Sequence, residues 1–317
     1  MGNFTKPWEW EYESYFGNFT LPEPWEWPSE DYRNWVVKNV LNGLATAFGL
    51  LANGLLLGLL SRAPPLRTVS NMFLLQRAVA DVLVLMVVPF IIYANIHHYY
   101  DEFSPPMCTA LSIVVHGAMM ASHMFLMLFT VDSYLASRPQ RHTLARRRKV
   151  LRVTSAAAWL LAPVSGAAAF FIFIRPVSAH CYFHQASLAF QMHDFVFRLG
   201  VPLVVVWVFV AMTRCCRPAE PSSQDKPEGG EGAPSRQLLL GLAASFTVIL
   251  VFIWIGVFQG YRLLFIDSMI PVIAFTLPYL EKVVNPILVI CLSEGLRQSV
   301  AGRLPVRRSA SLPLQEL

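Results

Sequence analysis

Ionisable side chains interrupt the long apolar runs of this sequence, at positions where a charge is costly and is usually functional. Arg77 precedes Asp81 by one helical turn, so the two can form an ion pair, or the arginine can extend to the interface. Glu281 precedes Asn285 by one turn and shares its helix face. Lys282 is rotated from Glu281 by about 100°, so these neighbours need not pair.

Two further pairs of polar residues share a helix face. Asp194 and Arg198 are four residues apart, so either they pair with each other or Arg198 binds a carboxylate or phosphate of a ligand. His116 and His123 are seven residues apart. Because histidine titrates near neutral pH, this second pair predicts either a proton sensor or the polar lining of a wet pocket.

The elements that carry these residues are seven separate apolar runs, each close to the roughly 20 residues that a helix needs to cross a bilayer. Of the 317 residues, 55% are hydrophobic and 14% are charged, whereas a soluble domain carries about 25% charged residues. Too few charges remain to cover the helices of a large soluble protein. We therefore expect an all-α membrane protein, a seven-transmembrane helix bundle. The runs cover about 36–60, 70–93, 107–136, 150–173, 192–213, 237–261 and 268–291.

Basic residues concentrate in the loops after the first, third and fifth runs and in the tail after the seventh. By the positive-inside rule these segments are cytoplasmic, and the N-terminal tail is extracellular. The net charge of +5 is thus explained by topology and gives no support to nucleic-acid binding. The first run is expected to act as an uncleaved signal, because the start of the chain lacks a basic and apolar leader pattern.

The N-terminal tail carries seven acidic residues over 1–35, against Lys6 and Arg33, and contains G-N-F-T and P-W-E-W twice each. Asn3 and Asn18 begin N-x-T sequons, which predicts glycosylation. An acidic tail with tryptophans can steer and hold a basic peptide or protein. The alternative is a glycosylated spacer whose repeat has no role.

Five cysteines divide between the two predicted sides of the membrane. Cys108 and Cys181 lie on the outer side, where an oxidising compartment favours a disulfide between them. Cys215, Cys216 and Cys291 lie at inner helix ends, where either free or palmitoylated thiols are expected.

Short motifs recur in order along the seven runs: G-L-L-A-N-G with Asn53, A-V-A-D with Asp81, Cys108, Trp159, Pro202, Trp254 and Asn285-Pro286. Together they resemble the rhodopsin-like (class A) G-protein-coupled receptors, as an orphan-type member, over nearly the whole membrane region. The resemblance implies a plasma-membrane receptor rather than an enzyme, with a heterotrimeric G protein and arrestin as partners. It also implies a short amphipathic eighth helix at about 293–304. In such receptors, tail tyrosines beside acids, as at Tyr12 and Tyr15, are often sulfated.

The resemblance also assigns candidate site residues. A ligand pocket is implied at His116, Asp194, Arg198, Trp254 and Tyr261. A sodium ion, with no other cofactor, is implied at Asp81, Ser122 and Asn285. Glu281 adds a carboxylate there, which either strengthens cation binding or shares a proton. A G-protein interface is implied at Asp132, Ser133, Tyr134, Arg138 and Arg146.

Three activation motifs of the family are altered in this chain. D-R-Y becomes Asp132-Ser133-Tyr134, so the arginine that pairs with the acid at rest and engages the G protein when active is missing. The proline of the sixth run is replaced by Gly256, which does not enforce a bend, and N-P-x-x-Y ends in Val289 without a hydroxyl.

Two functions therefore remain open. The first is a receptor that still signals through a G protein, with Arg77 reaching Asp132 as one substitute for the missing arginine. The second is a non-coupling or constitutively active receptor that binds a ligand or regulates a partner.

The chain is expected to divide into three segments. An extracellular tail covers 1–35, and a seven-transmembrane domain covers 36–291, with a disordered third inner loop at about 214–236 that is rich in Pro, Glu, Ser and Gly. The eighth helix and a cytoplasmic tail make up 292–317.

Overall fold

The computed structural model describes residues 29–62, 66, 68–97, 105–137, 144–173, 195–215, 234–260 and 269–302. Within these ranges the chain is helical and has no strand. The elements are α2 (Ser29–Arg62), α3 (Val69–His97), α4 (Pro105–Ala136), α5 (Leu144–Phe173), η2 (Phe195–Gly200), α7 (Val201–Cys215), α8 (Arg236–Gly260), α9 (Met269–Leu292) and α10 (Glu294–Val300).

The seven predicted spans are all found as helices. The fifth span consists of a π-helical turn, η2, that runs directly into α7. Six of the described helical spans, with η2 and α7 as one of them, are long and apolar enough to cross a bilayer, and there are seven if the bent pair of α9 and α10 is one span. The expected all-α membrane fold is confirmed.

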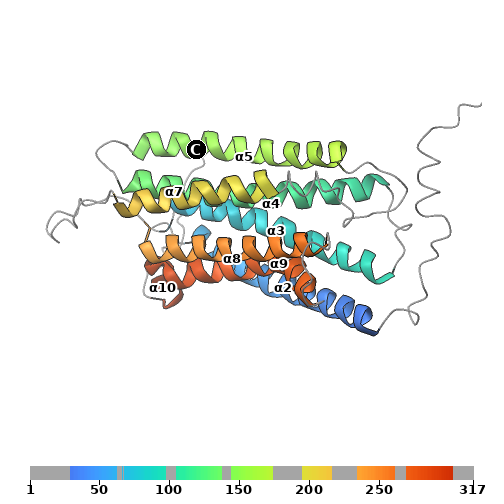
Figure 1. Cartoon of the computed structure of the whole chain (residues 1–317). Helices are drawn as coiled ribbons and strands as arrows, with labels where there is room; N and C mark the ends of the chain where they lie inside the picture. The colour runs from blue at the N-terminus through green and yellow to red at the C-terminus, as the bar shows by residue number, and fades with distance from the viewer. Residues whose placement is uncertain are drawn as a thin grey trace, which may run out of the picture.

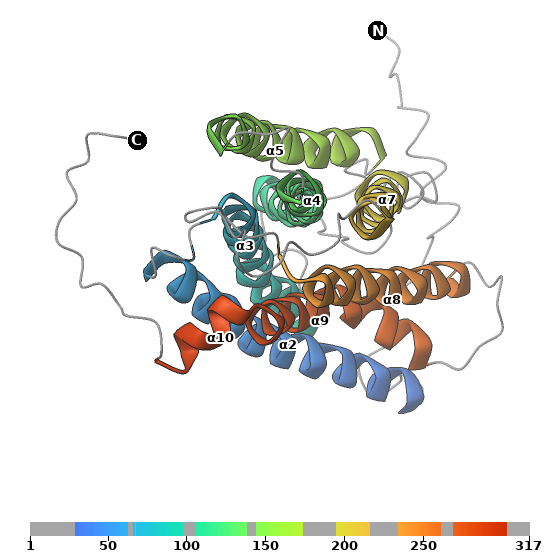
Figure 2. The ribbon, with the colours of Figure 1, turned by 90° about the vertical axis from the view of Figure 1, so that its left-hand side faces the viewer.

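The helices lie side by side in one bundle (Figure 1). Viewed end-on, α4 stands between α5, α3 and α7, and α9 stands between α2 and α8 (Figure 2). The fourth span, α5, lies at the edge of the bundle, and only 17% of its apolar window is buried. This arrangement places α4 and α9 between other helices, and both carry polar residues singled out above.

The outer surface of the bundle is apolar. Leu51, Leu160, Val164 and Val204 are all more than 60% exposed, whereas aromatic side chains such as Phe246 are buried between the helices. Apolar side chains spread over several helices in this way are compatible with lipid around the bundle rather than water.

The last two helices meet at a sharp corner. α10 turns away from α9 by 89° after Ser293. Leu296 of α10 is fully buried, and Gly295 packs against Leu66, so the short helix is tied to the loop after α2. The chain then leaves the helix through Gly302, which has φ of 67°. The expected eighth helix exists, with its end at Val300 rather than near residue 304.

Close contact between α4 and α5 depends on two glycines. A Cβ atom at Gly117 would lie 2.9 Å from the Cα of Pro163, and one at Gly166 would lie 3.0 Å from the backbone nitrogen of Gly117. Both contacts are with backbone, which cannot move aside as a side chain can. Small residues at these positions therefore let the two helices approach each other closely.

Gly117→Ala should destabilise the bundle by about 1–3 kcal/mol, because the new methyl group forces α4 away from α5. The measurement is the melting temperature of the solubilised full chain. Gly54→Ala is the matched control, since nothing lies within 4 Å of a Cβ atom at that position. Equal melting temperatures for the two variants would show that the α4–α5 contact tolerates the added volume.

Candidate functional site

Lys282 of α9 extends into the polar centre of the bundle. Its Nζ lies 2.9 Å from Oδ1 of Asp81 and donates to Oγ of Ser122 at 3.2 Å. Ser122 in turn donates to the same Asp81 oxygen at 2.6 Å. One carboxylate oxygen of α3 is therefore held by a lysine from α9 and a hydroxyl from α4.

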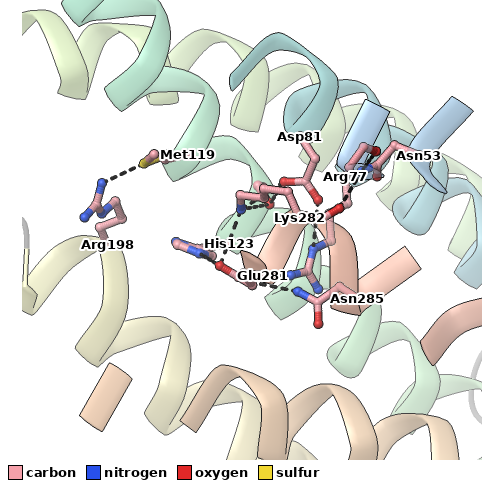
Figure 3. Close-up of polar contacts among 11 residues, drawn as sticks. Asn53, Arg77, Asp81, Met119, His123, Arg198, Glu281, Lys282 and Asn285 are labelled. Carbon is pink, nitrogen blue, oxygen red and sulfur yellow. Dashed lines mark hydrogen bonds and ion pairs between the residues drawn. The ribbon is translucent and has the colours of Figure 1, made fainter. Parts of the chain in front are cut away.

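Glu281, the preceding residue, has its own set of partners. Its Oε1 accepts from Nη2 of Arg77 at 2.7 Å and from Nδ2 of Asn285 at 2.9 Å. Its Oε2 lies 3.2 Å from Nε2 of His123 and 3.5 Å from Nζ of Lys282. Figure 3 shows these groups converging, with Arg77 and His123 approaching the glutamate from different helices.

Asn53 of α2 fixes the backbone beneath these side chains. Its Nδ2 donates to the carbonyl of Lys282 at 2.7 Å and to the carbonyl of Gly49, one turn earlier in its own helix, at 2.9 Å. The contact holds α9 against α2 at the residue whose side chain reaches Asp81. Four helices, α2, α3, α4 and α9, thus meet in one polar cluster, which we call the central cluster: Asn53, Arg77, Asp81, Ser122, His123, Glu281, Lys282 and Asn285.

The four ionic groups of the central cluster balance. Arg77, Asp81, Glu281 and Lys282 are each 3% exposed or less, and two positive charges face two negative ones. Arg77 also closes the ring of contacts, because its Nε lies 3.8 Å from Oδ2 of Asp81. Removing one partner of such a buried set leaves an uncompensated charge, which costs about 3–5 kcal/mol.

The residues present do not fit the sodium ion implied by the sequence. Oδ1 of Asp81 and Oγ of Ser122, two oxygens that would bind a cation, already contact the ammonium of Lys282. Asn285 points an N–H rather than an oxygen at Glu281, so the amide serves as a donor there. The sodium site remains a sequence-based prediction, and the observed contacts put a protein cation in its place.

A second buried ion pair lies near the C-terminal end of α4. Arg147, in the first turn of α5, donates from Nε to Oδ1 of Asp132 at 2.9 Å and from Nη2 to Oδ2 at 2.7 Å. Ser70 of α3 donates to Oδ2 of the same aspartate at 2.7 Å. We call Asp132, Arg147 and Ser70 the inner lock, because they join α3, α4 and α5 at the predicted cytoplasmic end.

The two residues after Asp132 differ in their surroundings. Ser133 is fully buried, and its Oγ donates to the carbonyl of Phe129 at 2.6 Å within the same helix. The ring of Tyr134 packs edge-on against Phe209 of α7, with centroids 5.6 Å apart. Serine at position 133 is thus directed into its own helix and not toward the cytoplasmic surface.

Arg77 does not reach Asp132. It lies near Asp81, as one of the sequence alternatives predicted, and it is buried rather than extended to the interface. Its closer partner is Glu281, which the sequence did not predict. Arg147 is the group that meets Asp132, and sequence reasoning missed it. The sequence alone did not distinguish it from its neighbours: in the structure Arg147 is buried, whereas Arg146, Arg148 and Lys149 are exposed.

The residues predicted for the ligand pocket are only partly placed. Arg198, in the π-helical turn, donates from Nη1 to Sδ of Met119 at 3.0 Å, as Figure 3 shows, and His116 is half-buried in α4. Asp194 and Tyr261 lie outside the described residues, and Trp254 lies in α8 with its side chain outside them. The pairing of Asp194 with Arg198 therefore stays a prediction.

Several other predicted positions also fall outside the described part of the chain. They are Asn3, Asn18, Tyr12, Tyr15, Cys181, Arg138 and Cys216, most of the third inner loop, and the side chain of Cys108. Cys215 and Cys291 are exposed free thiols. Glycosylation, sulfation, palmitoylation and the disulfide stay predictions.

Comparison with known proteins is consistent with this architecture. The family profile described as "7 transmembrane receptor (rhodopsin family)" matches residues 52–289, which is most of the chain. Similar curated proteins include somatostatin receptor type 5 of Bos taurus, 36% identical over 126 residues, covering 39% of this chain and 34% of that protein. Neuropeptides B/W receptor type 2 of Homo sapiens is 32% identical over 161 residues, covering 45% and 48%.

A third relative, C-C chemokine receptor type 3 of Macaca mulatta, is 36% identical over 100 residues, covering 30% of this chain and 27% of that protein. The matched segments thus span about a quarter to a half of the length of these relatives.

Arg147→Ala should destabilise the protein by about 3–5 kcal/mol, because Asp132 would stay buried without its cation. The measurement is the melting temperature of the solubilised full chain. Adding Asp132→Asn to the Arg147 variant should restore much of the loss, since the stranded charge is then removed.

Arg148→Ala is the matched control for this pair, because the neighbouring arginine is exposed. If Arg148→Ala were as harmful as Arg147→Ala, or if Asp132→Asn gave no rescue, the ion pair would not be the source of the effect.

Proposed function

The chain belongs to the rhodopsin family of seven-transmembrane receptors, and on this premise we propose that it signals through a heterotrimeric G protein in response to an extracellular peptide. It is a multi-pass membrane receptor and not an enzyme. The proposal concerns the ligand class, the coupling, the plasma-membrane location with the N-terminus outside, and arrestin as a second cytoplasmic partner.

The inner lock is the observation that carries the coupling proposal. In this family a cation paired with the acid of the third span holds the resting state, and that cation is normally the next residue in the chain. Here Arg147 supplies it from α5 with two hydrogen bonds to Asp132. The resting ion pair is therefore kept although the local arginine is absent. This supports a receptor that has an inactive state and can be switched out of it.

The G-protein contact must then use other groups. Arg146, Arg148 and Lys149 are exposed in the first turn and a half of α5, beside the inner lock. When Arg147 leaves Asp132, it joins the same basic surface. A cluster of basic side chains at the cytoplasmic end offers an electrostatically complementary surface to an acidic partner.

Peptide ligands are supported by two lines of evidence. The relatives named above are receptors for somatostatin, for neuropeptides B/W and for C-C chemokines, as their names state. The N-terminal tail of this chain is acidic and aromatic, which suits a basic peptide.

A non-coupling receptor is the second candidate. Its support is Ser133, which is fully buried, bonds to its own helix and offers no charge to a G protein. Such a receptor would bind its ligand, or pair with another receptor, without turnover of a G protein.

Asp132→Asn should raise basal G-protein activation at least about fivefold, because the neutral amide no longer holds Arg147 and the inner lock opens. The assay is G-protein subunit dissociation in cells, across the G-protein classes and at matched surface expression. Glu294→Gln, an exposed carboxylate on α10, serves as the control.

Ser133→Arg separates the two candidates in the same assay. If the wild type shows no basal G-protein activation and the Ser133→Arg variant does, the non-coupling receptor is favoured, with Ser133 as the residue that prevents coupling. Basal activity that is unchanged by Asp132→Asn would argue that the inner lock does not control the active state.

Deletion of residues 1–30 should weaken activation by a basic peptide agonist about tenfold or more, because the acidic tail no longer steers it. The measurement is the half-maximal concentration of the peptide in the dissociation assay. Arg198→Ala should leave such a peptide unaffected and should weaken an anionic agonist instead. If the deletion had no effect on the peptide and Arg198→Ala weakened its activation, Arg198 rather than the tail would recognise the peptide.

A further inference from the structure

We propose that Lys282 supplies, with its own ammonium group, the cation of the central cluster, and that a monovalent-cation site opens at Asp81 and Ser122 only when Lys282 is removed. The wild-type receptor is accordingly insensitive to sodium. The proposal concerns cation binding alone and holds whether or not the receptor couples to a G protein.

The surroundings of the ammonium are complete. An ammonium group has three N–H donors. Nζ of Lys282 has three oxygen partners, Oδ1 of Asp81 at 2.9 Å, Oγ of Ser122 at 3.2 Å and Oε2 of Glu281 at 3.5 Å. These are oxygens of the kind that bind a hard cation, and they come from three helices. The lysine nitrogen thus stands where their coordination would converge.

The charge of the cluster leads to the same conclusion. Arg77 and Lys282 balance Asp81 and Glu281, and all four are almost fully buried. A sodium ion added to this set would leave one uncompensated positive charge inside the bundle, where desolvation makes it costly. Without Lys282 the set would carry one net negative charge, and a small cation would restore neutrality.

Arg77, the other guanidinium or ammonium group of the central cluster, is not placed to act in its stead. Nη2 of Arg77 is engaged by Glu281 at 2.7 Å, and Nε of Arg77 lies 3.8 Å from Asp81, on Oδ2 rather than Oδ1. Lys282 in turn is held at its backbone by Asn53, which sets the point from which the side chain extends. The lysine is therefore fixed as the partner of Asp81 Oδ1 and Ser122.

The test measures the melting temperature of the detergent-solubilised full chain in sodium chloride and in choline chloride at matched ionic strength. Three proteins are compared: wild type, Lys282→Ala, and Lys282→Ala combined with Glu281→Gln. The double variant is the matched control, because it also lacks the ammonium but restores neutrality, with Arg77 facing Asp81 alone.

For wild type, the melting temperature should be the same in sodium chloride and in choline chloride. The same should hold for the double variant. Lys282→Ala should melt lower than wild type in choline. Sodium should raise its melting temperature saturably, by about 2 °C at roughly tenfold excess over the dissociation constant. Potassium chloride in a third arm should also raise its melting temperature, because the vacated space held an ammonium group, which is close in size to a potassium ion.

Three results would overturn the proposal. The first is a saturable, sodium-specific rise in wild type, since a solution cation would then bind beside Lys282. The second is a folded Lys282→Ala variant that does not respond to sodium. The third is a single variant recovered in neither salt while the double variant folds, because sodium would then be unable to replace the ammonium.

Discussion

A charge buried in a bilayer has to be neutralised by the protein itself, and this constraint organises the centre of the bundle. Arg77, Asp81, Glu281 and Lys282 are almost inaccessible, and none could be kept ionised at reasonable cost without its partners. Their mutual neutralisation draws α3 and α9 together, Ser122 and His123 add α4, and Asn53 adds α2 through the carbonyl of Lys282. α8 meets this frame through an aromatic contact, the ring of Phe246 against His123.

The same constraint explains the inner lock. Asp132 is buried, so it needs a cation whatever residue follows it in the chain. With serine at position 133, the guanidinium comes from Arg147, fifteen residues later and on another helix. The pair therefore joins α4 to α5, which is otherwise a peripheral helix that packs through glycines. The arginine missing at position 133 is thus replaced by Arg147, and the replacement links α4 to α5.

Much of the fold could be predicted, because an apolar run long enough to cross a bilayer is a local property of the sequence. Pairing inside the bundle could be predicted less well. The spacing of Arg77 and Asp81 indicated their proximity, but the argument from helix rotation missed the 3.5 Å approach of Lys282 to Glu281. Rotation describes where a side chain starts, whereas a lysine with four methylene groups can turn back toward its neighbour.

Arg147 was beyond local reasoning for a different reason. Its partner lies on the preceding helix, α4, so the contact exists only once the two helices pack. Among the basic residues of that run, only burial distinguishes it, and burial depends on which face of α5 meets α4. The sodium site could not be judged from the sequence for the same reason. Asp81 and Ser122 are adjacent as expected, but Lys282 from a third helix occupies the position beside them.

The neutrality of the central cluster also restricts how this sequence can change over generations. A single substitution at position 77, 81, 281 or 282 that removes a charge leaves an intermediate with an unpaired ion inside the membrane. An acid and a base would have to be lost together, or a compensating change would have to come first. These four positions should therefore drift as coupled pairs among descendants of this receptor, while the lipid-facing leucines around them vary independently.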